Sequence, residues 1–296
     1  MTQTTTGFGS HEMSAPLKRV LMAAPGEAMF TADAETWHYS TPINAAGVTE
    51  DFNQLEALLL EAGVVVDRLP AERGELADSV FTHDASIVTK HGAVLFTMGK
   101  RLRRGEEALH RAYYEEAGIP VLGEITAPGT MEGGDSVWLD DDTLAVGMGY
   151  RTNLAAVEQL REIFAPYGMR VLAYDLPVLG GPEACLHLMS VISPLAPDLM
   201  LVHYPLLPVR LALEMEQRGI RFVVTPEDEF EASFGINTNV LAVGPRDVIM
   251  VDGFPKTKAA LEAAGCRVQT FQGKHLCMVA EGGPTCMTRP VYRAAA

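Results

Sequence analysis

Apolar and polar positions alternate along this chain in two periods, one helical and one extended. In five segments the apolar residues are three or four apart, as in Leu55, Leu58 and Leu59, which predicts amphipathic helices. Each segment runs into a glycine and then into a short apolar run, which predicts a helix end followed by a strand. The predicted helices, each with its closing glycine, span residues 52–63, 106–118, 154–168, 209–219 and 255–265.

Short apolar runs between the helices predict the strands. Those directly after the glycines span residues 64–66, 119–121, 169–171, 220–222 and 266–268. The others span residues 79–81, 86–89, 94–97, 136–139, 144–147, 199–203, 240–243 and 248–251. Because helices and strands alternate, the sequence predicts an α/β fold.

The helix-closing glycines mark a repeat. They fall about fifty residues apart, at Gly63, Gly118, Gly168, Gly219 and Gly265. Such a period is typical of propeller-like architectures, in which each unit buries its apolar face against its neighbours. We therefore expect one five-fold α/β propeller domain over residues 17–296, and a disordered or loosely attached polar tail over residues 1–16.

Each unit has a polar side chain at about the same position after its helix-closing glycine. The five are Asp84, Glu132, His187, Asn239 and Cys286. In a ring, equivalent positions of the units point toward one axis. We therefore expect two carboxylates, an imidazole, a carboxamide and a thiol to meet in a central cleft.

Composition narrows the possible partners. The net charge of −15 argues against nucleic acid or an anionic membrane and favours a cationic ligand. The chain has no run of about 18 apolar residues and no signal-type apolar block near its start, so we expect a cytoplasmic protein. No His-x-x-x-His or Cys-x-x-Cys pair is present, so we expect no metal site.

Cys286 is the candidate nucleophile among the four cysteines. It ends a Gly-Gly-Pro-Thr turn, where a thiol is held at a loop end. Cys185, Cys266 and Cys277 stand beside apolar neighbours and fit a core role better. A nucleophilic thiol needs a nearby cation or base. His187 is the candidate base, although a histidine beside an apolar run is more often structural.

Carboxylates and arginines suggest a ligand that carries both signs of charge. Asp84 lies between two apolar runs, where a buried charge is costly unless it meets a cation, and Glu132 and Asp135 flank a glycine pair that could equally be a capped turn. Arg103 and Arg151 could clamp a carboxylate with their planar guanidinium groups, although the basic cluster around Arg103 could also be a solvated face. A ligand shaped like arginine fits this set.

These motifs, taken together, resemble the guanidino-group-modifying enzymes of the pentein fold, which include dimethylarginine dimethylaminohydrolase, arginine deiminase and the amidinotransferases. The resemblance covers most of the chain. The residues that carry it are Phe81-Thr82-x-Asp84, Glu132-Gly133-Gly134-Asp135, Arg151-Thr152-Asn153, His187-Leu188 and Gly282-Gly283-Pro284-x-Cys286. It implies a ring of five ββαβ units, in agreement with the repeat.

The resemblance also implies roles. Cys286 would be the nucleophile, His187 the general acid and base, and Glu132 and Asp84 the residues that hold the guanidinium. Arg103 and Arg151 match positions that grip the substrate α-carboxylate, and we count Phe81 and Asp135 as substrate-binding too. The implied reaction passes through a thiouronium ester on Cys286 to a ureido product such as citrulline, without a metal or cofactor.

Two departures from the deiminase pattern favour the dimethylaminohydrolase branch. Met189 stands where deiminases carry a second aspartate, and His83 stands where they commonly carry arginine. We therefore expect Nω-methylarginines as substrates of a small-molecule hydrolase that could form homo-oligomers. The alternatives are an amidinotransferase, an arginine deiminase, an arginine dihydrolase and a ring-shaped binding protein.

Overall fold

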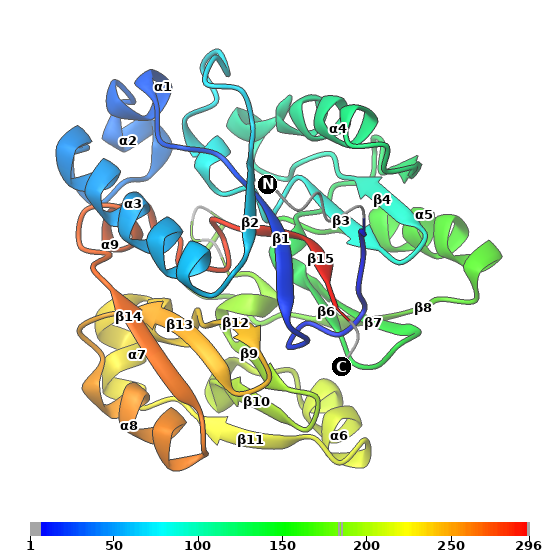
Figure 1. The fold of residues 1–296 in the computed structure, drawn as a ribbon. Helices are drawn as coiled ribbons and strands as arrows, with labels where there is room; N and C mark the ends of the chain where they lie inside the picture. Colours follow the sequence, from blue (N-terminus) through cyan, green and yellow to red (C-terminus); the bar gives the residue numbers. More distant parts are fainter. Residues whose placement is uncertain (1–6, 183, 185, 295–296) are drawn as a thin grey trace.

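The structure, a computed structural model, describes residues 7–182, 184 and 186–294. Over these residues, fifteen strands form five three-stranded sheets (Figure 1). In each sheet the first strand is antiparallel to the second, and the second is parallel to the third. A helical connection joins the two parallel strands, as a parallel pair requires; it contains one α-helix in four sheets and three, within residues 27–61, in the fifth.

Four of these ββαβ units follow one another along the chain. The first is β3 (Ser86–Thr89), β4 (Gly92–Leu95), α4 (Glu106–Glu116) and β5 (Val121–Glu124). The second is β6 (Ser136–Trp138), β7 (Thr143–Met148), α5 (Leu154–Phe164) and β8 (Arg170–Asp175). The third is β9 (Ile192–Ala196), β10 (Leu199–Val202), α6 (Val209–Gln217) and β11 (Arg221–Val224). The fourth is β12 (Leu241–Gly244), β13 (Asp247–Val251), α8 (Pro255–Ala263) and β14 (Arg267–Phe271).

The fifth unit joins the two ends of the chain. Its first strand is the C-terminal β15 (Arg289–Arg293), and β1 (Leu17–Met22), α3 (Ala45–Glu61) and β2 (Val65–Arg68) follow from the N-terminal side. The antiparallel pairing of β15 with β1 completes the ring. The predicted five-fold α/β propeller of ββαβ units is thereby confirmed.

Short elements lie between the repeated ones. The remaining helices are α1 (Glu27–Phe30), α2 (Ala34–Trp37), α7 (Glu227–Ser233) and α9 (Cys277–Ala280). The 3₁₀ turns are η1 (Ala77–Val80), η2 (Arg101–Arg103), η3 (Gly133–Asp135), η4 (Ala165–Tyr167), η5 (Leu188–Ser190), η6 (Tyr204–Leu206) and η7 (Ile236–Thr238). None of the helices in the described residues is long and apolar enough to span a membrane.

The repeat signal in the sequence has a conformational cause. All five helix-closing glycines adopt left-handed backbone angles, from φ +68° at Gly118 to φ +84° at Gly265. A Cβ at Gly63 or Gly118 would meet no atom within 4 Å, so the backbone angle rather than lack of space selects glycine there.

Three strands escaped the sequence prediction, and one predicted strand is wrong. Residues 79–81 belong to or follow the 3₁₀ turn η1. The unpredicted strands are β1, β9 and β15. In β15 the buried positions are Arg289, Val291 and Arg293, while Pro290 and Tyr292 are partly exposed. The strand therefore buries its charged residues, and a search for alternating apolar positions misses it.

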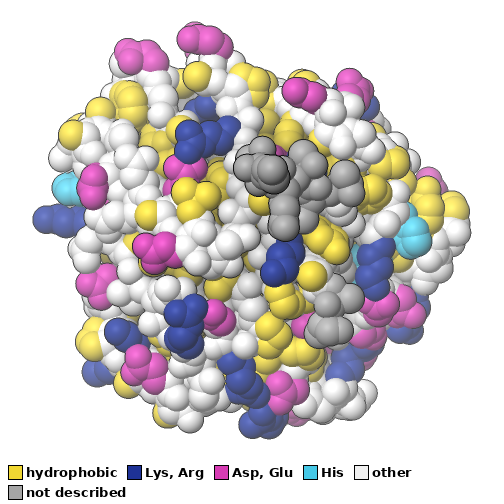
Figure 2. Space-filling view, viewed as in Figure 1, with side chains coloured by type: hydrophobic (Ala, Val, Ile, Leu, Met, Phe, Trp, Pro, Cys, Tyr) yellow, Lys and Arg dark blue, Asp and Glu magenta, His cyan; other side chains and the backbone are white. Residues whose placement is uncertain are grey.

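The N-terminal segment also differs from the prediction of a loose tail. His11, Ser14 and Ala15 are buried, and the His11 ring stacks on Trp138 with ring centroids 3.9 Å apart. Residues 7–16 therefore pack against the ring, while residues 1–6 lie outside the described part. On the face shown in Figure 2, Lys and Arg side chains are interspersed with Asp and Glu side chains rather than gathered into one patch.

Candidate active site

One cavity of about 70 Å³ brings Cys286, His187 and Asp84 together, and we call it the thiol cavity. Phe81 and Arg151 are also in its wall. The wall also contains residues to which the sequence analysis assigns no role, among them Trp37, Asp78, Lys100 and Glu281.

The five recurring polar residues occupy equivalent places in the ring. Each comes shortly before the first strand of its unit: Asp84 before β3, Glu132 before β6, His187 before β9, Asn239 before β12 and Cys286 before β15. Because these strands have equivalent positions in the five units, their preceding loops converge. Backbone hydrogen bonds connect neighbouring loops directly. Gly133 N–H donates to the Asp84 oxygen at 2.9 Å, and His83 N–H donates to the Cys286 oxygen at 3.0 Å.

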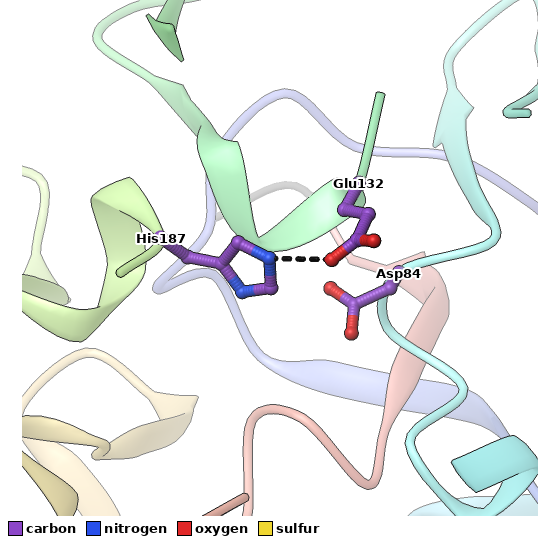
Figure 3. A group of neighbouring side chains, drawn as sticks. All are labelled: Asp84, Glu132 and His187. Carbon is purple, nitrogen blue, oxygen red and sulfur yellow. Dashed lines mark hydrogen bonds and ion pairs between the residues drawn. The ribbon is translucent and has the colours of Figure 1, made fainter. Parts of the chain in front are cut away.

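Glu132 and His187 form a buried pair beside this cavity (Figure 3). His187 Nε2 lies 2.7 Å from Glu132 Oε2, and Glu132 is fully buried. Glu132 also accepts from the Lys100 backbone N–H at 2.9 Å and from Arg151 Nη1 at 3.1 Å. Although burial opposes its charge, the hydrogen bond with His187 and the Arg151 guanidinium hold the pKa of Glu132 below its ordinary value.

The glycine pair in the Glu132 loop makes room for the histidine. A Cβ built at Gly134 would lie 2.5 Å from His187 Nδ1 and 3.1 Å from Asp84 Oδ1. Any larger residue would push the imidazole away from the carboxylates. The backbone N–H of Gly134 instead donates to Asp84 Oδ1 at 2.9 Å, so glycine both fits and orients Asp84.

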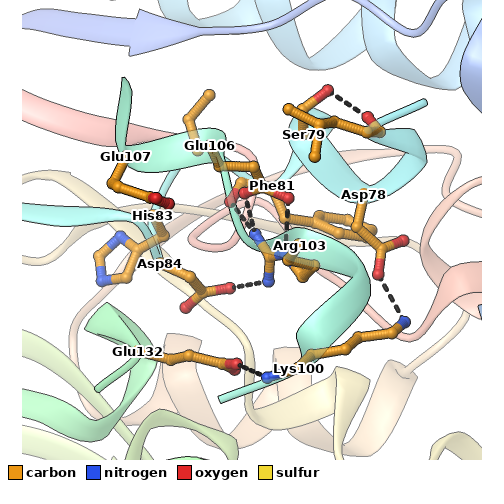
Figure 4. Close-up of polar contacts among 12 residues, drawn as sticks. Asp78, Ser79, Phe81, His83, Asp84, Lys100, Arg103, Glu106, Glu107 and Glu132 are labelled. Atoms are coloured by element: carbon orange, nitrogen blue, oxygen red, sulfur yellow. Dashed lines mark hydrogen bonds and ion pairs between the residues drawn. The ribbon is translucent and has the colours of Figure 1, made fainter. Parts of the chain in front are cut away.

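Arg103 lines the thiol cavity, but its guanidinium group is already bound to other residues of the protein. Its side chain is only 4% exposed, and it donates to Asp84 Oδ2 at 2.7 Å, to both Glu106 oxygens and to the Phe81 carbonyl (Figure 4). Four donors of one guanidinium are thus committed inside the protein, so a substrate carboxylate has no access to them. The expectation that Arg103 grips that carboxylate is corrected: Arg103 positions Asp84. Although burial of Asp84 opposes its negative charge, the Arg103 guanidinium lowers the pKa of this carboxyl group.

Cys286 is held by Asn239, which the sequence analysis places among the five recurring polar residues without assigning it a role. The Asn239 amide donates to Cys286 Sγ at 3.1 Å, and its oxygen accepts from the Thr285 backbone N–H at 2.9 Å. Burial and the negative charge of Asp84 raise the pKa of the Cys286 thiol to about 11. The free cavity therefore keeps this thiol protonated at neutral pH.

The other predicted binding residues divide into two groups. Phe81 and Arg151 line the thiol cavity, and the Phe81 ring packs so closely on Gly282 that a Cβ there would overlap it. Asp135 does not line the cavity. It accepts from the Thr152 hydroxyl at 2.6 Å and from the Leu188 backbone N–H at 2.9 Å, so it anchors the histidine loop, and burial raises its pKa to about 6.

A second charged cluster at the cavity wall was not predicted. Lys100 Nζ lies 2.6 Å from Asp78 Oδ2, 3.0 Å from the Trp37 carbonyl oxygen and 5.0 Å from the centre of the Trp37 ring. The Tyr39 hydroxyl donates to Asp78 Oδ1 at 2.8 Å. Lys100 and Arg103 belong to the same basic cluster and both line the cavity, but nothing in the sequence shows that Lys100 pairs with Asp78 and Arg103 with Asp84.

Met189 also lies elsewhere than the resemblance implied. Its side chain is buried among apolar residues of η5, β9 and β10 and does not line the thiol cavity. The use of Met189 as a sign of Nω-methylarginine substrates, for which it would have to leave room for the alkyl group, is therefore wrong in its geometry.

Of the described cysteines, Cys266 and Cys277 are buried, in agreement with a core role, and Cys185 lies outside the described residues. Ligand atoms of Asp84, Glu132 and His187 lie within 4.8 Å of one another, close enough to share a cation. Both carboxylates already contact arginine side chains.

Comparison with known proteins identifies the family of this chain. The family model described as arginine deiminase matches residues 70–209 and 205–293. A dimethylarginine dimethylaminohydrolase from Streptomyces coelicolor is 32% identical over 211 residues, which cover 71% of this chain and 73% of that protein.

Among solved structures, a dimethylarginine dimethylaminohydrolase from Pseudomonas aeruginosa, in complex with citrulline, has a TM-score of 0.75 at 22% identity, covering 94% of this chain and 100% of that one. An amidinotransferase of saxitoxin biosynthesis from Microseira wollei has a TM-score of 0.82 at 18% identity, covering 98% of each chain.

The matched residues and the dimethylarginine dimethylaminohydrolase relative define the class as enzymes that act on guanidino groups. The chain belongs to the arginine deiminase family, in the pentein superfamily. The resemblance drawn from its motifs is confirmed.

Proposed function

We propose that this protein is a cysteine-dependent hydrolase of arginine-like guanidino compounds, and that it converts an Nω-methylarginine to citrulline and an alkylamine. The observation that carries the proposal is the convergence of the Cys286 thiol, the His187–Glu132 pair and the buried Asp84 carboxylate at one cavity. The dimethylarginine dimethylaminohydrolase relative at 32% identity supports the substrate class.

Substrate binding follows from charge. A guanidinium stays protonated in proteins and donates in a plane. Asp84 is fixed by Arg103 and Gly134 and retains acceptor sites for a substrate N–H group. Glu132 is bound by Lys100, Arg151 and His187, and its negative charge attracts the substrate cation. The bound cation lies between these carboxylates and the sulfur of Cys286.

The substrate also activates the nucleophile. Since Asp84 and burial raise the pKa of Cys286, a cation in the cavity lowers it by offsetting that negative charge. The thiol proton passes to His187, and the sulfur forms a bond to the central guanidinium carbon. The Asn239 amide, 3.1 Å from the sulfur, stabilises the thiolate.

The remaining steps return every group to its starting state. His187 gives its proton to the departing nitrogen, the C–N bond breaks, and an alkylamine leaves a thiouronium ester on Cys286. A water molecule then adds to the same carbon as His187 takes its proton. The C–S bond breaks and His187 returns the proton to the sulfur. The second proton of the added water passes to solvent, so the ureido product leaves as a neutral group.

The amino-acid end of the substrate meets the cavity wall. Arg151 and Lys100 supply positive charge for an α-carboxylate, and Asp78 supplies negative charge for an α-ammonium group. Here Arg151 and Lys100 replace the pair Arg103 and Arg151 that the resemblance suggested.

Product analysis tests the proposal. The protein is incubated with arginine, monomethylarginine and dimethylarginine, with and without an acceptor amine, and Cys286→Ser is the control. We expect citrulline with methylamine or dimethylamine from the methylated substrates, at a higher kcat/KM than ammonia from arginine. Ammonia chiefly from arginine would replace this proposal with a deiminase, and a guanidino product on the acceptor amine would replace it with an amidinotransferase.

A further inference from the structure

A second cavity, of about 40 Å³, lies at the centre of the ring, and we call it the arginine cavity because Arg289 and Arg293 line it. The first strand of every unit contributes to its wall: β3, β6, β9, β12 and β15. The residues just before these strands line or adjoin the thiol cavity, so the two cavities follow one another through the ring.

In two of the loops, one residue lines the arginine cavity and the next residue lines the thiol cavity. His83 and Thr285 line the arginine cavity, whereas the next residues, Asp84 and Cys286, line the thiol cavity. Figure 4 shows the His83 ring and the Asp84 carboxylate pointing in different directions. The proposed reaction leaves the side chains of His83 and Thr285 unused.

Positive charge in the arginine cavity lacks a matching carboxylate. Arg289 is 5% exposed and donates to the His83 carbonyl, and Arg293 is 6% exposed and donates to the carbonyls of Ala15 and Ala242. Within the described residues neither forms an ion pair. Glu12, also in the wall, acts on Arg293 only at longer range.

A buried cation without a counter-charge is costly. Burial accordingly lowers the pKa of Arg289 to about 10, although Tyr114 and Asp84 oppose this, and that of Arg293 to about 9, against the opposing charge of Glu12.

Three buried polar atoms around this cavity have no hydrogen-bond partner in the described part of the chain: Arg289 Nε, Thr285 Oγ1 and His83 Nε2. The first two carry hydrogens to donate. His83 Nδ1 lies 2.9 Å from the Thr288 carbonyl oxygen and must donate to it, so Nε2 of the neutral ring is an acceptor. Three unsatisfied groups in one buried cavity indicate an occupant that accepts from two of them and donates to the third.

We propose that the arginine cavity binds a small inorganic monoanion of halide size, together with one water. The anion accepts from Arg289 Nε–H and the Thr285 hydroxyl and offsets the charge of Arg293, while the water donates to His83 Nε2. A volume of about 40 Å³ holds on the order of three waters, which suits a halide and a water but not a large organic anion.

Crystallography with bromide tests the site directly. Crystals of the full chain grown in sodium gluconate are transferred to sodium bromide, and anomalous differences are measured at the bromine edge. We expect a peak within hydrogen-bond distance of Arg289 Nε and Thr285 Oγ1. Water density at that place without an anomalous peak would overturn the proposal.

Thermal unfolding tests it in solution. At equal ionic strength, chloride or bromide should raise the Tm by about 2–4 °C relative to gluconate, because the anion binds only the folded protein. Thr285→Val removes one donor at nearly constant shape, and Arg289→Met removes the other, so both should lose most of this shift. Arg170→Gln, at an exposed arginine paired with Asp142, is the matched control and should keep it. An equal shift in wild type and Thr285→Val would overturn the proposal even if Arg289→Met failed to fold.

Discussion

The two cavities in this ring are built from adjacent residues, but their charged groups are paired differently. In the thiol cavity, the wall carboxylates Asp84 and Asp78 are paired with the cations Arg103 and Lys100. In the arginine cavity, guanidinium groups face the interior and backbone carbonyls hold them. Buried carboxylates that already have partners can still bind a cation, whereas buried arginines bound only to carbonyls lack a counter-charge. The first cavity therefore suits a guanidinium and the second an anion.

The largest expected effect is the loss of turnover on substitution of Cys286, which should leave halide binding in the arginine cavity unchanged. Cys286→Ser should abolish turnover, because a serine hydroxyl does not supply the accessible anion of a thiol. The same variant should keep the halide-dependent rise in Tm, since its side chain does not line the arginine cavity. Citrulline formation and thermal unfolding are measured in parallel, with Cys266→Ser as the control for a buried thiol elsewhere. Turnover by Cys286→Ser would remove the covalent mechanism.

His187→Ala should lower kcat by about 10²–10⁴-fold, the usual range for a lost proton-transfer group. Substrate binding should persist, because Asp84, Glu132 and Arg151 still provide the charges that hold the guanidinium and the carboxylate. Single-turnover kinetics and calorimetric binding distinguish the two effects. A parallel loss of binding would instead assign His187 to the organisation of the carboxylates.

Two arginines of the thiol cavity should respond differently. Arg103→Ala should reduce the free energy of unfolding by about 3–5 kcal/mol, because it leaves Asp84 and Glu106 as unpaired buried charges. Arg151→Ala should instead raise KM by roughly 10–100-fold, the equivalent of a lost charge-assisted hydrogen bond, for arginine-like substrates and much less for guanidines without a carboxylate. Denaturant unfolding and KM values for both substrate classes check the contrast. Similar behaviour of the two variants would contradict the roles assigned here.

The pH dependence of the thiol should sharpen the contrast in charge. The pKa of Cys286 is raised to about 11, so its thiolate fraction should grow as the pH rises and reach half near pH 11 in the free protein. Asp84→Asn removes a negative charge beside the sulfur and should lower this midpoint. Far-ultraviolet absorbance of the thiolate is followed, with Cys286→Ser as the blank. A midpoint near neutrality in the wild type would show that another group already compensates Asp84.

The smallest expected effect is that of a chelator. Asp84, Glu132 and His187 are close enough to hold a cation, but the proposed mechanism assigns that place to the substrate guanidinium. Dialysis against EDTA should therefore leave kcat/KM unchanged. A loss that is restored by one divalent metal would show that the carboxylates hold an ion as well.

Sequence reasoning reached the ring because its signals are local. Left-handed glycines close the five helices, and the residues before the first strands recur at one phase, so the approach of Asp84, Glu132, His187, Asn239 and Cys286 could be foreseen. Roles that depend on side-chain direction could not. Arg103 and Lys100 are three residues apart and both line the thiol cavity, yet Arg103 is paired with Asp84 and Lys100 with Asp78.

The same limit explains the two largest errors. Met189 follows His187 by two residues, but its side chain enters an apolar cluster. Strand β15 buries Arg289 and Arg293, against the usual rule that charged residues face solvent, so a hydropathy pattern alone does not reveal it.

The pairing of β1 with β15 also sets the order in which the enzyme can be completed during synthesis. Strand β1 emerges from the ribosome early, but its antiparallel partner starts at Arg289, near the end of the chain. Cys286 precedes that partner by only a few residues, so the nucleophile is translated after the acid, the base and the carboxylates that surround it. The four internal units are already synthesised when this partner strand is made. The site itself is expected to form only after β15 has been synthesised and has paired with β1.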